Sequence, residues 1–338
     1  MSAGARRLVL VLGPGRSGTS TMAGALAYSG YRVPQAIRGN ETNPAGFFEP
    51  RWVVNFHRKL LTRADVRTLD TDPAAFERMA KLTGDPAVRD ELAAWLAGHL
   101  ESKDRLVIKD PRLVWFRDLW VDVARAAGVE PGFVMMLRHP SEVSSSRSEY
   151  YNAGEVTGVA GWVNVALMTE RLTSGSPRAL VLYPELTADW RAQLTRVRDQ
   201  LGIELEPDPS VTPHPVDDFI DPQLRRMRAG WADSHVPGFL RDLGDRTFDA
   251  LASLAGEDPA TGTTPALTEL AQEYTHLHAD CLAVVKPHTT RARTQAARRA
   301  ARRARTQERE RASESGDHPA AADLVGRVRA RLARTVRR

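Results

Sequence analysis

Short, uninterrupted apolar runs alternate with longer segments of helical periodicity along the first two hundred residues. Such runs stand at 8–12, 106–108, 132–137 and 179–182, and the segment that begins near Trp52 repeats apolar residues at three- and four-residue spacing. Continuous apolar runs are typical of strands buried on both faces, and the periodic segments are typical of helices that cover a sheet. The pattern predicts an α/β protein with a central parallel sheet between two layers of helices.

Further helices and the domain limits follow from the same pattern. Helical periodicity is expected at 73–82, 86–100 and 159–172, and in two stretches between 216 and 255 that use Trp231 and Phe239 as packing anchors. We predict a main domain over residues 1–255, then a linker and one additional helix at 256–285. Residues 286–338 form an Arg-rich basic tail, helical or partly disordered, so that the whole chain has a helical C-terminal extension.

The first strand runs directly into a glycine-rich turn that could bind an anion. Gly13-Pro14-Gly15-Arg16-Ser17-Gly18 precedes a predicted helix that starts with three hydroxyl residues, and a helix start after such a turn offers free N–H groups to a phosphate. The spacing nearly fits the P-loop G-x-x-x-x-G-K-[ST], but Thr19 stands where the lysine would be. The basic group is instead Arg16, inside a P-loop-like turn. A turn without a ligand would leave Arg16 and the hydroxyls unexplained.

Three segments resemble sulfotransferases that use PAPS (3′-phosphoadenosine 5′-phosphosulfate). Gly15-Arg16-Ser17-Gly18-Thr19-Ser20 resembles their 5′-phosphosulfate loop, and Arg138 at a strand end with Ser146 eight residues later resembles their 3′-phosphate motif. The strand that ends at Tyr183 resembles the element whose tyrosine approaches the adenine, although a buried tyrosine accounts for it equally well. The segments keep the family's order over most of residues 8–186. The resemblance implies a bacterial sulfotransferase-domain protein with these PAPS-binding residues: Gly15, Arg16, Ser17, Gly18, Thr19, Ser20, Arg138, Ser146 and Tyr183.

Catalytic candidates come from two further segments. The loop at 34–50 carries an Asn-Pro-x-Gly-aromatic-aromatic-Glu string that resembles a sulfotransferase loop, which favours Glu49 as general base; an acid that complements a helix N-terminus is the alternative. Glu41 in the same loop is a second candidate.

The strand at 106–108 ends in Lys109, which matches the family's lysine at the transferring group. The cytosolic branch has its histidine base where this chain has Pro111. Asp110 is either a structural partner of Arg112 or another candidate base.

The resemblance implies transfer of a sulfuryl group from PAPS to a hydroxyl, less favourably an amine, of a carbohydrate, glycan or other small-molecule acceptor, with PAP released. Glu49, Lys109 and Arg16 are the expected catalytic residues, and no metal is expected. Residues 144, 145, 147 and 148 are expected to be mostly solvated positions of the helix after Arg138. Two alternatives stay open: a P-loop kinase that uses ATP, and a non-catalytic protein that binds a nucleotide or polyanion.

The distribution of charge and the cysteine content bear on the partners and the cellular compartment of the protein. The formal charge is +5, but residues 286–338 hold sixteen Lys/Arg and five Asp/Glu, so the tail carries +11 and the rest 5 − 11 = −6. The basicity therefore belongs to the tail, which could be solvated, lie on an anionic membrane or other polyanion, or contact nucleic acid; specific nucleic-acid recognition is not favoured. A lone Cys281 suits a reducing cytoplasm. We expect a cytoplasmic protein, with a peripheral position at the inner membrane face as the alternative.

Overall fold

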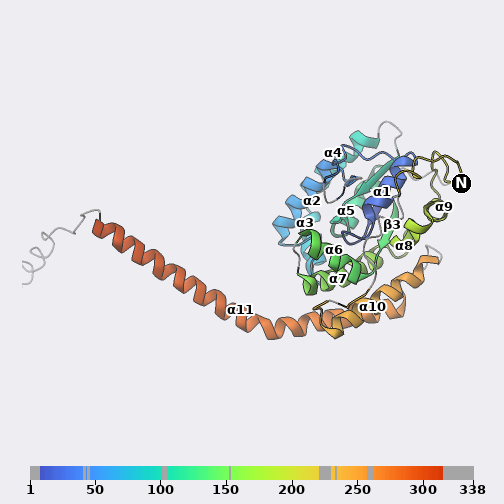
Figure 1. The fold of residues 1–338 in the computed structure, drawn as a ribbon. Coiled ribbons are helices and arrows are strands. Elements are labelled where there is room, and N and C mark those ends of the chain that lie inside the picture. The colour runs from blue at the N-terminus through green and yellow to red at the C-terminus, as the bar shows by residue number, and fades with distance from the viewer. Residues whose placement is uncertain are drawn as a thin grey trace, which may run out of the picture. The chain divides into compact units, whose positions relative to one another are not determined.

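The computed structural model describes residues 8–40, 43, 46–100, 105–151, 154–220, 230–232, 234–256 and 262–314. Strands alternate with helices from the start of the described chain, as the apolar pattern predicts (Figure 1). The elements are β1 (Leu8–Leu12), α1 (Thr19–Tyr28), α2 (Arg51–Ala64), α3 (Ala75–Thr83), α4 (Pro86–Leu100), β2 (Leu106–Lys109), η1 (Leu113–Phe116), α5 (Arg117–Ala126), β3 (Gly132–Leu137), α6 (Pro140–Tyr151), α7 (Glu155–Thr173), β4 (Arg178–Leu182), α8 (Tyr183–Ala188), α9 (Trp190–Leu201), α10 (Gly238–Ala252), η3 (Ser253–Gly256) and α11 (Pro265–Glu314).

The sheet of the described residues has four parallel strands in the order β2-β1-β3-β4. From β1 the chain moves to β2 on one side and then to β3 on the other, so the direction of winding reverses beside β1. In open α/β sheets, ligands bind outside the carboxyl ends of the strands at this kind of switch point. The ends of β1, β2 and β3 are therefore the edge at which functional side chains should be sought.

Alternating residues of β1 build two cores, one on each face of the sheet. Leu8, Leu10 and Leu12 pack into a cluster with α2, α3, α4 and α5. Val9 and Val11 pack into a second cluster with α1 and α9. Because successive strand residues point to opposite faces, a strand covered by helices on both sides must be apolar throughout. The predicted three-layer α/β/α fold with a central parallel sheet is confirmed.

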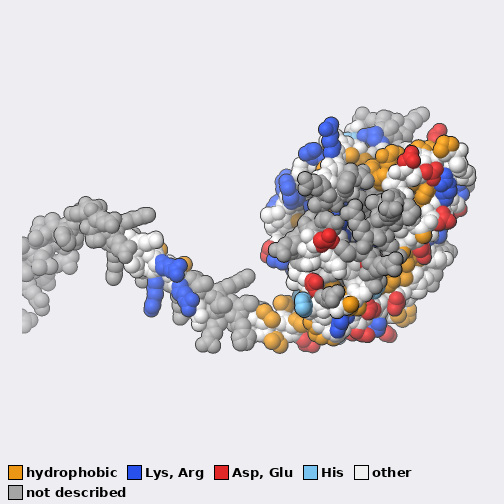
Figure 2. Space-filling view, viewed as in Figure 1, with side chains coloured by type: hydrophobic (Ala, Val, Ile, Leu, Met, Phe, Trp, Pro, Cys, Tyr) orange, Lys and Arg blue, Asp and Glu red, His pale blue; other side chains and the backbone are white. Residues whose placement is uncertain are grey.

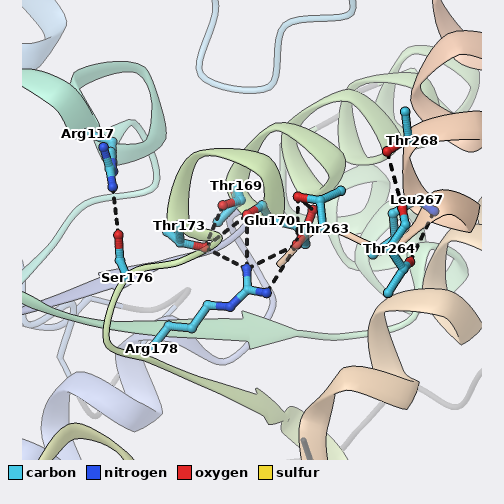
Figure 3. Close-up of polar contacts among 10 residues, drawn as sticks. All are labelled: Arg117, Thr169, Glu170, Thr173, Ser176, Arg178, Thr263, Thr264, Leu267 and Thr268. Carbon is cyan, nitrogen blue, oxygen red and sulfur yellow. Dashed lines mark hydrogen bonds and ion pairs between the residues drawn. The ribbon is translucent and has the colours of Figure 1, made fainter. Parts of the chain in front are cut away.

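A third cluster extends the core to the start of α11. Leu267, Leu270 and Tyr274 are buried with residues of β3, α7 and α10. The turn before this helix is also held: Thr263 Oγ1 donates to Glu170 Oε2 at 3.1 Å, and Glu170 forms a buried ion pair with Arg178 at 3.2 Å (Figure 3). Helix α11 thus starts at Pro265, and its first turns pack on the core.

Other expectations for this region need correction. The segment that follows Val216 is a turn up to Ile220, and 230–232 and 234–237 are not helical; helix α10 starts only at Gly238. Phe239 is 54 % exposed, so the prediction that it anchors the packing is wrong. Trp231 is half-buried, and its Nε1 donates to Asp245. The periodicity misled because two apolar residues near prolines fit a helical spacing by chance.

Residues 1–278 form one compact unit and residues 279–338 a second. Helix α11 continues without a break from the predicted additional helix into the Arg-rich tail, as far as Glu314. The assignment of nucleotide binding to residues 1–255 stays a prediction, because it refers to a ligand. No helix among the described residues is long and apolar enough to cross a membrane.

Candidate active site

Two glycines give the loop between β1 and α1 its course. A Cβ at Gly13 would lie 2.5 Å from the Met136 carbonyl oxygen, and one at Gly18 would lie 2.2 Å from Cδ2 of Tyr183. Gly18 also has φ +85° and is the N-cap of α1, where it offers no side chain to the first N–H groups of the helix. The first backbone N–H groups of α1 and the positive end of its dipole can therefore bind a ligand, and this arrangement is typical of anion sites.

A buried hydroxyl within the loop fits an anion as well. Ser17 is fully buried, and its Oγ has no hydrogen-bond partner among the described residues. An unsatisfied buried hydroxyl costs about 1–3 kcal/mol, so such groups persist where a ligand completes them. The loop residues predicted to bind a phosphosulfate, 15–20, thus combine helix N–H groups, small residues and an unsatisfied donor in one turn.

The two predicted phosphate motifs contact each other. Arg16 Nε donates to Ser146 Oγ on α6 at 2.9 Å, across 130 residues of sequence. Arg138 Nη1 donates to the Arg16 carbonyl oxygen at 3.2 Å, and its Nε donates to the buried carboxylate of Glu142 at 2.7 Å. Both arginines therefore belong to one site at the carboxyl ends of β1 and β3.

Tyr183 lies against the same loop. Its ring is buried, packs on Gly18 and faces the Arg138 guanidinium at 4.7 Å from the ring centroid. This is a cation–π contact that fixes Arg138. The predicted approach of Tyr183 to an adenine stays a prediction, and the observed contacts agree with the alternative of a buried structural tyrosine.

The end of β2 brings a lysine to the start of α1. Lys109 Nζ donates to Ser20 Oγ at 3.1 Å and to Glu49 Oε1 at 2.5 Å, and both members of this ion pair are buried. Glu49 reaches the site because its loop folds back: Ile37 N donates to the Glu49 carbonyl oxygen at 2.9 Å, and Phe48 takes φ +51°. The predicted base and the predicted cation are direct partners.

Asp110 has a structural environment. Its Oδ2 lies 2.9 Å from His57 Nδ1, and its Oδ1 accepts from the backbone N and the guanidinium of Arg112 at 3.0 and 2.7 Å. Burial alone would raise the pKa of this carboxyl, but the hydrogen bonds from His57 and Arg112 outweigh it and keep the Asp110 pKa below its usual range. These contacts favour the structural alternative over a base. The other candidate, Glu41, lies outside the described residues.

Sequence analysis missed two residues near this site. Arg147 was expected to be solvated, yet it is half-buried, and its Nη1 lies 3.9 Å from the position that a Cβ at Gly15 would take. The signal available was its place directly after Ser146. His57 was not singled out, since a lone histidine in a helical segment has no distinguishing neighbours in sequence; it is fully buried against Asp110.

Four basic side chains gather at this loop. Lys109 pairs with Glu49 and Arg138 pairs with Glu142, while Arg16 belongs to the loop and Arg147 lies close to Gly15. No group of three or more His, Cys, Asp or Glu side chains within the described ranges is placed to hold a metal ion. The helix N-terminus, the unsatisfied hydroxyl of Ser17 and the nearby basic side chains fit a phosphate or sulfate group.

No protein-family model and no curated protein matches the sequence. Among solved structures, the sulfotransferase domain from the olefin synthase of Synechococcus PCC 7002 is similar at 17% identity over 81% of this chain and 96% of that chain, with a TM-score of 0.39. A sulfotransferase domain from the curacin biosynthetic pathway is similar at 13% identity over 78% and 96%, with a TM-score of 0.36.

Proposed function

We propose that the protein transfers the sulfuryl group of PAPS to a hydroxyl of a carbohydrate or other small-molecule or glycan acceptor and releases PAP. An amine acceptor is the less favoured form of the same reaction. The residues that support this proposal are the loop 15–20, Arg138 and Ser146 for the two phosphate positions, and Glu49, Lys109 and Arg16 for the transfer. Two phosphate-binding motifs that contact each other suit a donor with phosphates at two positions.

The contact between Lys109 and Ser20 carries the proposal. In G-x-x-x-x-G-K-[ST] loops the last hydroxyl binds Mg²⁺ and the lysine before it reaches the β- and γ-phosphates. Here Thr19 replaces that lysine, and Ser20 Oγ, the corresponding hydroxyl, accepts from the Lys109 ammonium at 3.1 Å. The Lys109 ammonium thus lies beside Ser20, at the position of the hydroxyl that binds Mg²⁺ in a P-loop kinase. This favours sulfuryl transfer over the kinase alternative.

In the proposed reaction, Glu49 takes the proton of the acceptor hydroxyl. The acceptor oxygen forms a new bond to sulfur as the bond between sulfur and the 5′-phosphate oxygen breaks, and the electron pair of the broken bond stays on PAP. Lys109, Arg16 and the N–H groups at the start of α1 stabilise the charge on that oxygen. General-base assistance contributes roughly 10²–10⁴-fold, and preorganised donors typically contribute more.

Calorimetry with PAP, ATP and ADP tests the donor. We expect PAP to bind more tightly than ATP or ADP without added metal. Arg138→Lys keeps the charge that pairs with Glu142 but removes the planar fork, and should weaken PAP by about tenfold. Arg125→Ala, which removes an exposed arginine paired with Glu130, is the control and should bind PAP normally. Tighter binding of ATP that requires Mg²⁺ would favour the kinase.

Turnover separates an enzyme from a non-catalytic nucleotide-binding protein. Glu49→Gln should bind PAP within about twofold of the wild type, because the amide oxygen can still accept from Lys109, yet it should transfer sulfate from ³⁵S-labelled PAPS at least about 10²-fold more slowly to a panel of sugar acceptors. Equal rates for the two proteins would remove Glu49 from the reaction.

We also propose that the Arg-rich part of α11 contacts a polyanion. Arg299, Arg302 and Arg303 are exposed, and Figure 2 shows Lys and Arg side chains on this helix. These arginines are three and four residues apart, where like charges repel by about 0.2–0.5 kcal/mol per pair, and residues 287–307 contain no acid to compensate them. The compensating charge is proposed to come from an anionic polymer or an anionic membrane surface.

A further inference from the structure

His57 ties α2 to the end of β2 from inside the core. Its side chain is fully buried, its Nδ1 lies 2.9 Å from Asp110 Oδ2, and Trp120 Nε1 lies 3.0 Å from its Nε2. An indole N–H can only donate, so Nε2 must be the acceptor; Nδ1 therefore carries the proton and donates to Asp110. The tautomer is thus fixed by two partners from two different elements.

Helix α2 meets the end of β2 at two successive residues. Glu49, just before Pro50 and the first turn of α2, pairs with Lys109; His57, on the second turn, pairs with Asp110. Lys109 also reaches Ser20 on α1, and Asp110 also holds the backbone N and guanidinium of Arg112. Two adjacent contacts of this kind fix both the position and the rotation of the strand end relative to α2.

We propose that His57 is a positioning residue for the transfer reaction: through Asp110 it fixes the end of β2, and with it the Lys109 ammonium between Glu49 and Ser20. The roles of Lys109 and Glu49 in this inference rest on the proposed function. Within the described part of the chain the His57 ring nitrogens bond to Asp110 and Trp120, so His57 acts through Asp110. Burial lowers the His57 pKa, which keeps the ring in the neutral form, whose Nε2 can accept from Trp120 while Nδ1–H donates to Asp110.

Three variants distinguish a role of His57 in positioning Lys109 from a general contribution of His57 to the stability of the fold. His57→Leu removes both hydrogen bonds; His57→Gln retains an N–H donor for Asp110 and an oxygen acceptor for Trp120. Trp120→Phe leaves the bond between His57 and Asp110 intact but leaves His57 Nε2 without its donor, so it is a destabilised control. Thermal unfolding of each full-length variant identifies the temperature at which all three are folded, and the remaining measurements are made there.

The first measurement requires neither the sulfuryl donor PAPS nor an acceptor substrate. Reductive methylation followed by mass spectrometry gives the labelling rate of Lys109 relative to Lys59, whose side chain is 56 % exposed. In the wild type, and in His57→Gln and Trp120→Phe, the buried Lys109 should react much more slowly than Lys59. His57→Leu should raise the Lys109 rate several-fold. An unchanged rate in folded His57→Leu would overturn the proposal, whatever the protein's reaction.

The second readout uses PAP binding and sulfate transfer. His57→Leu should lower kcat by about 10²-fold, the size expected when a reacting group is misplaced by about 1 Å, while the Kd for PAP changes by less than about threefold. His57→Gln should recover most of kcat, and Trp120→Phe should retain it. Equal losses of kcat in His57→Leu and Trp120→Phe would indicate a general effect of stability and contradict positioning. If the wild type binds no PAP, the proposed function fails, and the labelling experiment still decides the role of His57.

Discussion

At the scale of single residues, the site is a set of buried ionic contacts in which each member depends on the others. Lys109 and Glu49 are 4 % and 11 % exposed at their side chains. A buried charge is tolerated only with its partner, because the desolvation penalty is offset by the attraction between the two. The same residues proposed for transfer therefore also contribute to stability, and single substitutions affect both.

Removal of one member of this pair should be costly, and removal of both should not. Lys109→Met leaves the Glu49 carboxylate buried without its cation, and should lower the free energy of unfolding by about 3–5 kcal/mol. In Lys109→Met/Glu49→Gln no charge is left unpaired, and most of the loss should be recovered. Urea unfolding followed by circular dichroism measures both. Additive losses in the double variant would show that the two side chains do not interact.

His57 makes stability depend on pH. Its pKa is lowered by burial, outweighing the hydrogen bond to Asp110, so below its ordinary value of 6.5 the unfolded chain takes up a proton that the folded chain does not. Stability is therefore full above about pH 6.5 and falls as the pH decreases toward the lowered pKa, by at most about 1.4 kcal/mol per pH unit for this group. His57→Gln should show a shallower decline between pH 6.5 and 5 in unfolding experiments. His139, whose pKa is also lowered by burial, remains in both proteins, so the difference between the two curves reports His57.

At the scale of elements, the loop between β1 and α1 is shaped by contact with α8. Gly18→Ala would combine a left-handed backbone with a Cβ 2.2 Å from the Tyr183 ring. Gly128→Ala is the matched control, since Gly128 has φ +74° and nothing within 4 Å of the added Cβ. The control should lose about 1–2 kcal/mol of stability from backbone strain alone and bind PAP normally. Gly18→Ala should lose more and should bind PAP at least about tenfold more weakly; equal behaviour of the two would show that the Tyr183 contact is unimportant.

The part of the site that could be predicted from sequence is the part formed by residues that are close in sequence. The run Leu8–Leu12 and the glycines after it predict a strand, a turn and a helix, because chain conformation there is decided by neighbours in sequence. The contact of Arg16 with Ser146 spans 130 residues, and that of Lys109 with Ser20 spans 89. Periodicity shows that a strand is buried, but it does not show which strand lies beside it. The strand order, and hence these contacts, could not be predicted from pattern alone.

At the scale of the whole molecule, the negative balance of residues 1–285 and the positive tail make the proposed polyanion contact of α11 testable apart from PAP binding. Arg299→Ala/Arg302→Ala/Arg303→Ala should keep α11 helical, since alanine is the best helix former, while it removes charge. We expect weaker binding to heparin and to a short DNA duplex, with the slope of log K against log salt for the duplex smaller by up to about 3, and unchanged binding of PAP.

The control for this experiment replaces Arg58, Lys59 and Arg63, which are exposed on α2, with alanine. This variant should bind heparin and the duplex as the wild type does. Vesicles that contain phosphatidylglycerol distinguish a membrane surface from a polymer. Polyanion binding that is equally strong in both variants would exclude this part of α11 as the contact.

The sequence by itself determined the α/β class and located the glycine-rich turn and the two motifs that we predict bind phosphate, because each depends on residues that are adjacent or a fixed few positions apart. Only the tertiary structure decided that Lys109 lies beside Ser20 and Glu49, that Asp110 belongs to His57 and Arg112, and that Arg147 lies over the loop. The physical reason is that these contacts depend on how separate elements pack, and packing is set by the shape of the two cores as a whole. A local pattern shows which residues can take part in a site, and the packed core decides which of them meet.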